Sequence, residues 1–141
     1  MQKLYVVTRS NLSPGAIVAQ SCHAVSAFAV RFPDEHRTWH AHGQNLVVLA
    51  TPDESALDWL IRALEGVHHI PCAAFFEPDL DHALTAFAVS DRAAKLLSQL
   101  PLALRAPRCS DCKEGQLVPS ARAAPSSDLR RRCDRHHAIA R

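Results

Sequence analysis

Glycine is scarce in this chain of 141 residues, which contains four glycines and nine prolines. Neither the G-x-G-x-x-G nor the G-x-x-x-x-G-K pattern occurs, and these are the loops that hold dinucleotides and nucleoside triphosphates. The G-x-S-x-G turn that presents the serine of many hydrolases is also missing. These absences remove the main support for ATP, dinucleotide or serine-nucleophile chemistry.

Long hydrophobic runs are missing as well. No stretch of 18 or more apolar residues occurs, so the sequence predicts no membrane span. The N-terminus leads directly into a strand that contains Lys3, without the apolar core and small-residue cleavage site of a signal peptide. The five cysteines, an odd number, argue against a disulfide scaffold. We therefore predict a cytoplasmic protein.

The net charge of +2 is distributed unevenly along the chain. Residues 1–104 contain seven Lys and Arg against ten Asp and Glu, a net charge of −3, whereas residues 105–141 contain nine against four, a net charge of +5. The second part also has few large apolar side chains, a composition typical of segments that cannot form a core. We predict one domain over 1–104 and a basic, disordered tail over 105–141.

The hydrophobic pattern of the first 104 residues predicts alternating strands and helices. Apolar, β-branched runs of five to seven residues alternate with stretches of helical spacing, and Ser13-Pro14 and Thr51-Pro52 are typical helix starts. This β-α-β-α-β-β-α order predicts an α/β fold with three layers, α-β-α, around a four-stranded mixed sheet. We expect a mostly parallel sheet with one antiparallel pairing, between the third and fourth strands. The predicted strands are 3–9, 45–51, 72–77 and 84–89, and the predicted helices are 13–32, 52–65 and 91–100, with a polar connection over 33–44 that includes a short helix around Trp39.

Ligands of open α/β sheets bind beyond the carboxyl ends of the parallel strands. Glu77 ends the third strand, and the first helix brings Gln20 and His23 to the same side of the molecule. A carboxylate facing a histidine is a reasonable pair for general acid–base catalysis. The residues predicted to surround this edge are His23, Glu77, Gln20, Arg9, Asn11 and Asp79.

The same residues also have purely structural interpretations. His23 on a helix face of small residues is consistent with a histidine that is hydrogen-bonded between helix and sheet, and the pattern alone favours this interpretation. Asp79 is a common residue in turns. Gln20 is consistent with a surface position. The pattern by itself therefore leaves both interpretations open.

The tail contains a possible metal-binding pattern, Cys109-x2-Cys112 followed by Cys133-x2-His136. Three cysteines and a histidine form a known structural zinc set. The segment between the two pairs lacks the strands and glycines of a zinc ribbon, so the composition favours incidental cysteines in a disordered tail. We predict no metal site.

Residues 15–24, Gly-Ala-Ile-Val-Ala-Gln-Ser-Cys-His-Ala, resemble the Gly-Lys-Ile-Ala-Ala-Gln-Cys-Ala-His-Ala stretch of the peptidyl-tRNA hydrolase 2 family, the archaeal and eukaryotic type. The resemblance extends over the order of elements to about Leu104. It implies a four-stranded mixed sheet between helices and hydrolysis, without a cofactor, of the ester that joins a stalled peptide to its tRNA. It also implies a possible homodimer and a role in translation quality control.

The resemblance assigns roles to individual positions. Ala16 replaces the lysine of the family motif, Glu77 falls on the aspartate of an Arg-Asp-Ala-Gly motif, and Thr85 corresponds to the threonine that begins the fourth strand. By resemblance, Glu77 and His23 would activate or orient water, while Thr85 and Gln20 would hold the ester or its oxyanion. Two alternatives stay open: a divergent hydrolase acting on another acyl or amide substrate, and a non-catalytic binding module on the same scaffold.

Overall fold

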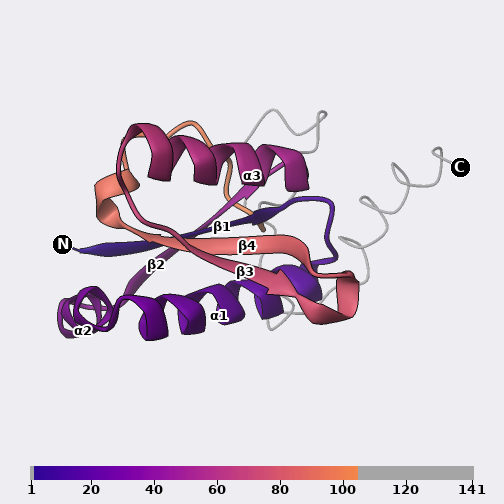
Figure 1. Cartoon of the computed structure of the whole chain (residues 1–141). Coiled ribbons are helices and arrows are strands. Elements are labelled where there is room, and N and C mark those ends of the chain that lie inside the picture. The colour runs from indigo at the N-terminus through magenta and orange to yellow at the C-terminus, as the bar shows by residue number, and fades with distance from the viewer. Residues whose placement is uncertain (1, 105–141) are drawn as a thin grey trace, which may run out of the picture. The chain divides into compact units, whose positions relative to one another are not determined.

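A four-stranded mixed sheet forms the centre of the chain in this computed structural model, which describes residues 2–104 (Figure 1). The strand order is β2-β1-β4-β3. The α/β fold class predicted from the sequence is confirmed. The tail over 105–141, with its cysteine and histidine pattern, lies outside the described residues, so the predicted domain boundary stays a prediction. The strands are β1 (Lys3–Arg9), β2 (Asn45–Thr51), β3 (Ala73–Glu77) and β4 (Ala83–Ser90).

Helices cover both faces of the sheet and produce the predicted three layers. Figure 1 shows α1 and α2 on one face and α3 on the other. The bounds are α1 (Pro14–Arg31), α2 (Pro33–Ala41) and α3 (Glu54–Arg62), the last continued by one π-helical turn, η1 (Ala63–Val67). None of the helices within residues 2–104 is long and apolar enough to cross a membrane.

The cap of α1 fixes where that helix begins. The Ser13 side chain accepts a hydrogen bond from the backbone N–H of Ala16, and Pro14 occupies the first helical position, where its missing N–H costs nothing. The helix ends at Arg31, two residues before Pro33. These bounds agree with the prediction to within one residue.

The pairing of β4 differs from the prediction of a mostly parallel sheet. This strand lies between β1 and β3 and runs antiparallel to both, while β1 and β2 are parallel. The sheet therefore contains two antiparallel pairings instead of the one that we expected. The seven consecutive buried residues from Leu84 to Ser90 explain why β4 takes a central place.

One further predicted helix is confirmed and one is not. The short helix predicted around Trp39 is α2, and its buried Trp39 anchors it to the sheet. The last predicted helix is reduced to a 3-10 helix, η3 (Asp91–Ala93), followed by turns. After these turns Pro101 and Ala103 form backbone hydrogen bonds with the edge strand β2, so the chain extends away instead of continuing a helix.

The core has two halves, one on each face of the sheet. Side chains alternate along β4, so that Phe87 and Val89 pack with α3 residues such as Leu57, while Ala86 and Ala88 belong to the cluster under α1. The small alanine side chains let α1 approach the sheet closely. The residues that α1 turns toward the sheet are therefore held against β4.

Candidate active site

The carboxyl ends of β1, β2 and β3 lie at one edge of the sheet, together with the start of the antiparallel β4. This edge brings together Arg9, Thr51 and Glu77 as strand ends, and Thr85 near the start of β4. The N-terminal half of α1 crosses the same edge (Figure 1). The predicted location of the site is thus where chemistry-bearing side chains collect.

A hydrogen-bonded chain links Glu77, Gln20 and Thr85. The Thr85 hydroxyl donates to Gln20 Oε1 at 2.8 Å, and Gln20 Nε2 donates to the Glu77 carboxylate. Thr85 also lies 3.5 Å from the carbonyl oxygen of Phe75. The structure therefore brings together three of the seven residues predicted for the site.

Burial restricts the movement of the three hydrogen-bonded side chains. Gln20 is 6% exposed, Thr85 is fully buried, and Glu77 is half-buried. Because both ends of the Gln20 amide have partners, its oxygen faces Thr85 and its nitrogen faces Glu77. Of these three hydrogen-bonded side chains, Glu77 is the one that reaches the surface.

Thr85 lies at a β-bulge. The pairing of β3 with β4 passes from Phe75–Ala86 directly to Phe76–Leu84, which leaves Thr85 as the extra residue. Bulges interrupt the ladder and redirect a side chain, and they are frequent beside active sites. Here the Thr85 carbonyl accepts from the Thr8 hydroxyl at 3.0 Å.

His23 lies one turn after Gln20 on α1 and is exposed. Its ring stacks on Phe75, with ring centroids 4.6 Å apart and an interplanar angle of 16°. The Glu77 carboxylate accepts from Gln20 instead, and the structure of residues 2–104 records no hydrogen bond between His23 and Glu77. The stack fixes the imidazole near the network.

Arg9 forms an ion pair that the sequence analysis missed. Its Nη1 lies 2.8 Å from Glu54 Oε2, and the arginine side chain is 12% exposed. Glu54 Oε1 accepts from the backbone N–H of Leu84 at 2.9 Å. Position 54 looks like an ordinary first-turn acid of a helix, so no pattern distinguished it.

Asn11 and Asp79 occupy the rim of this edge. Asn11 lies in the turn between β1 and α1, and Asp79 lies in the 3-10 helix η2 (Pro78–Leu80). Both are exposed, and the structure of residues 2–104 records no side-chain hydrogen bond for either. They are available to a ligand but are not part of the network.

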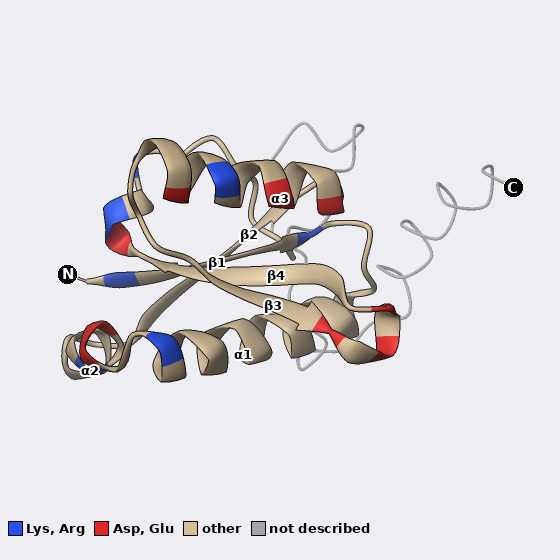
Figure 2. Cartoon of the chain, in the orientation of Figure 1, with Lys and Arg blue, Asp and Glu red and all other residues tan. Residues whose placement is uncertain are grey.

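Carboxylates outnumber cations around the edge. Figure 2 shows acidic residues where β3 ends, in the turn after it and at the start of α3. Arg9 is paired with one of these acids. No group of three or more possible metal ligands occurs within residues 2–104. The described residues thus form an acidic site without a metal cluster, and the Cys109, Cys112, Cys133 and His136 pattern lies outside them.

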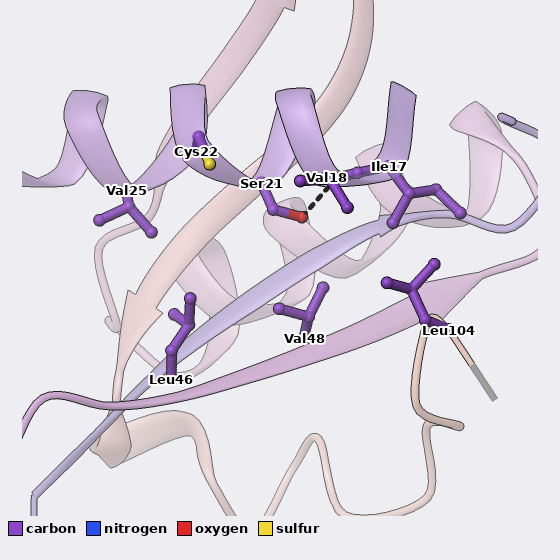
Figure 3. A pocket seen from close by; sticks show the side chains of 8 residues that line it. All are labelled: Ile17, Val18, Ser21, Cys22, Val25, Leu46, Val48 and Leu104. Carbon is purple, nitrogen blue, oxygen red and sulfur yellow. Dashed lines mark hydrogen bonds between the residues drawn. The ribbon is translucent and has the colours of Figure 1, made fainter. Parts of the chain in front are cut away.

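An apolar groove lies on the other flank of α1 (Figure 3). It has a volume of about 330 Å³ and opens between α1 and β2. None of its lining side chains belongs to the network of Gln20. The lining residues are Ile17, Val18, Ser21, Cys22, Val25, Leu46, Val48 and Leu104.

A solved structure of a protein of unknown function from Agrobacterium tumefaciens str. C58 is similar to this chain, with a TM-score of 0.51 and 15% sequence identity. The alignment covers 72% of this chain and 96% of that one, and it supports the fold alone. None of the curated proteins compared with this chain matches it.

The comparison with protein families shows more than the fold. Residues 2–78 match the family described as Peptidyl-tRNA hydrolase PTH2. The match covers more than half of the chain and spans β1, the Gln20 and His23 turns of α1, and Glu77 at the end of β3. The chain belongs to the peptidyl-tRNA hydrolase PTH2 family.

Proposed function

We propose that this protein hydrolyses the ester bond of peptidyl-tRNA and releases the peptide and the tRNA. Family membership supports this reaction class. The observation that carries the proposal is the buried Thr85–Gln20–Glu77 chain, which ends in a half-buried carboxylate at the open edge of the sheet.

Glu77 is the proposed general base. Its carboxylate accepts a proton from a water molecule as the water oxygen attacks the ester carbon. The bond between that carbon and the ribose oxygen then breaks, and the ribose oxygen takes up a proton. His23, one turn further along α1, is the proposed donor of this proton, and its stack on Phe75 holds the ring in place.

Gln20 and Thr85 have supporting roles in this proposal. One N–H of the Gln20 amide holds Glu77, and the second is suited to donate to the oxyanion that forms on the ester. Thr85 is fully buried and donates to Gln20, so it acts as a positioning residue rather than a direct substrate contact. Both roles use the same fixed orientation of the Gln20 amide.

The rim residues divide into two groups. Asn11 and Asp79 are exposed at the rim and are proposed to contact the substrate. Arg9 is 12% exposed and paired with Glu54, so we assign it to the framework of the edge rather than to a substrate phosphate. Ala16, where the resembling motif has lysine, supplies no cation.

The test is release of peptide from an N-blocked aminoacyl-tRNA. Glu77→Gln is expected to lower kcat by about a hundredfold or more, because loss of a general base typically costs 10²–10⁴-fold. His23→Ala and His23→Phe separate chemistry from packing, because phenylalanine keeps the stack on Phe75 and lacks the ring nitrogens. Equal losses in both variants support proton transfer, whereas activity retained in His23→Phe assigns His23 to packing.

A second candidate function is hydrolysis of another acyl or amide substrate by the same residues. The excess of carboxylates around the edge favours it, because tRNA phosphates are attracted by clustered Lys and Arg. Turnover of small N-acyl esters that depends on Glu77, without turnover of the tRNA ester, would select this candidate. Turnover of neither substrate by the wild-type protein would instead favour a binding module.

The setting of the reaction also belongs to the proposal. We place the protein in the cytoplasm, where ribosomes release peptidyl-tRNA during translation. The pairing of two copies stays a prediction.

A further inference from the structure

The start of β4 lacks part of the hydrogen-bond ladder that fixes the rest of the strand. The bulge removes Thr85 from the pairing with β3, and the pairing with β1 extends only as far as Ala86. Thr85 therefore lacks a ladder partner on both sides, whereas Leu84 still pairs with Phe76 of β3 and lacks a partner only on the side of β1, so this backbone needs other contacts to hold it. Leu84 and Thr85 are the residues for which such contacts matter.

The Glu54 carboxylate supplies one of these contacts. Its Oε1 accepts from the backbone N–H of Leu84 at 2.9 Å, at the position immediately before Thr85. Glu54 is the first residue of α3, so its backbone is fixed by the cap that Asp53 gives this helix. One side chain thus connects the beginning of α3 to the beginning of β4.

The second oxygen of Glu54 holds the end of β1. Glu54 Oε2 lies 2.8 Å from Arg9 Nη1, and the arginine side chain is largely buried. The adjacent residue, Thr8, donates its hydroxyl to the Thr85 carbonyl at 3.0 Å. Leu84 and the bulged residue Thr85 are therefore both connected to the same carboxylate, Leu84 directly and Thr85 through Arg9 and Thr8 of β1.

We propose that Glu54 is a positioning residue of the site, which replaces the missing ladder hydrogen bond at Leu84 and thereby directs the Thr85 hydroxyl toward Gln20. The effect of Glu54 on catalysis rests on the proposed function. The effect of Glu54 on the geometry of Leu84, Thr85 and Gln20 is independent of that function.

The competing explanation is an ordinary surface ion pair. The Glu54 side chain is 47% exposed, and exposed pairs contribute little to stability. An ion pair alone would change the stability of the fold without moving Gln20. The two explanations therefore differ in what they predict for the side-chain amide of Gln20.

The experiment uses the full-length, ¹⁵N-labelled protein and compares Glu54→Ala with Glu35→Ala. Glu35 is also a first-turn acid of a helix, and residues 2–104 offer it no recorded side-chain hydrogen bond, which makes it a matched control. In Glu54→Ala we expect displaced resonances of the Leu84 backbone amide and the Gln20 side-chain amide, and faster hydrogen exchange at Leu84. In Glu35→Ala these resonances should stay in place. Unchanged Gln20 resonances in folded Glu54→Ala would overturn the proposal.

Glu54→Gln is the variant to measure if Glu54→Ala does not fold. Glutamine keeps an acceptor for the Leu84 N–H but no longer carries the charge that pairs with Arg9. The Leu84 amide proton is then expected to move upfield, because a neutral acceptor polarises it less than a carboxylate. An unmoved Leu84 resonance in this variant would likewise refute the contact.

Kinetics on the N-blocked aminoacyl-tRNA complete the test. Because a small misplacement of catalytic groups can cost up to about a hundredfold, Glu54→Ala is expected to lower kcat by about ten- to a hundredfold while KM changes by less than about threefold. A change in KM alone would contradict a positioning role. If the wild-type protein shows no turnover, the proposed function fails, whereas the resonances of Leu84 and Gln20 still decide the role of Glu54.

Discussion

At the scale of single residues, the hydroxyl of Thr85 determines how Gln20 is oriented. It is the only side-chain donor recorded for Gln20 Oε1 among residues 2–104, and it is fully buried. The hydrogen bonds from Thr85 to Gln20 and from Gln20 to Glu77 therefore depend on one hydroxyl group.

We predict that Thr85→Val destabilises the fold and lowers activity. Valine has nearly the same shape but no hydroxyl, so Gln20 Oε1 loses its partner in a buried place, at a cost of about 1–3 kcal/mol. We expect kcat to fall by about tenfold or more as the amide turns. Chemical denaturation and peptide-release assays measure the two effects. Thr85→Ser keeps the hydroxyl and is the control; equal losses in both variants would show that any change of the side chain at this buried position, rather than the missing hydrogen bond, is responsible.

The two cysteines of the described part should react very differently. Burial, followed by the negative charge of Glu65, raises the pKa of the Cys72 thiol to about 12, whereas Cys22 is exposed in the apolar groove. At pH 8 iodoacetamide is expected to alkylate Cys22 and to leave Cys72 unmodified until the protein unfolds. Peptide mapping by mass spectrometry measures both sites in one sample, so Cys22 is the internal control. Equal rates would show that Cys72 is accessible.

The same thiol affects stability at high pH. In the unfolded chain Cys72 ionises near its ordinary pKa of 9.0, while in the folded protein it keeps its proton up to about pH 12. The folded state thus binds more protons between these values, so the free energy of unfolding falls as the pH rises through this window.

Sequence analysis predicted the positions of Glu77 and Gln20 in the fold better than their contacts. Glu77 and Gln20 were assigned from strand ends and helix position, which follow directly from the local pattern. The Gln20 bridge depends on the bulge at Thr85, and the Glu54 contact depends on the backbone N–H of Leu84, which has no partner in β1 because that pairing ends at Ala86. Neither has a local sequence signal, because both arise from how distant strands align.

At the scale of secondary-structure elements, prediction succeeded where a local signal fixes a boundary. The Ser13-Pro14 cap set α1, and a short apolar run set each strand. Prediction failed for 91–100, where helical spacing was present but only Ala93 and Leu97 are buried toward the core. Isolated short helices are marginal without packing, and here the competing pairing of Pro101 and Ala103 with β2 prevailed. The central place of β4 depends on long-range pairing, which the order of elements does not determine.

The cap of α3 gives a prediction at this scale. The Asp53 side chain accepts from the backbone N–H of Ala56 at 2.9 Å, whereas the sequence had suggested Thr51 as the cap. Asp53→Ala is expected to lower the free energy of unfolding by about 1 kcal/mol, because the N–H loses its acceptor. Asp53→Asn keeps an acceptor oxygen and should lose much less. Urea denaturation measures both, and equal losses would show that charge rather than capping matters.

At the scale of the whole molecule, the described part carries the acidic site and the remaining sequence carries the positive charge. Residues 1–104 have a net charge of −3, and residues 105–141 have +5. Arg9, the cation at the site edge within residues 2–104, is already paired with Glu54. If the substrate is a tRNA ester, attraction of its phosphates must therefore come mainly from 105–141.

This distribution predicts that Arg130, Arg131 and Arg132 contribute to tRNA binding. Their replacement by glutamine is expected to raise KM for peptidyl-tRNA and to leave kcat nearly unchanged, because Glu77, Gln20 and Thr85 stay in place. Each lost phosphate contact lowers the slope of log KM against log salt by about 0.7–0.9, so the triple variant should lose about 2 units of slope. Arg37→Gln, which removes an exposed cation of α2, is the control for net charge. A salt slope that is the same in the triple variant and the wild type would show that 105–141 does not hold the tRNA, and it would strengthen the case for a substrate without a phosphate backbone.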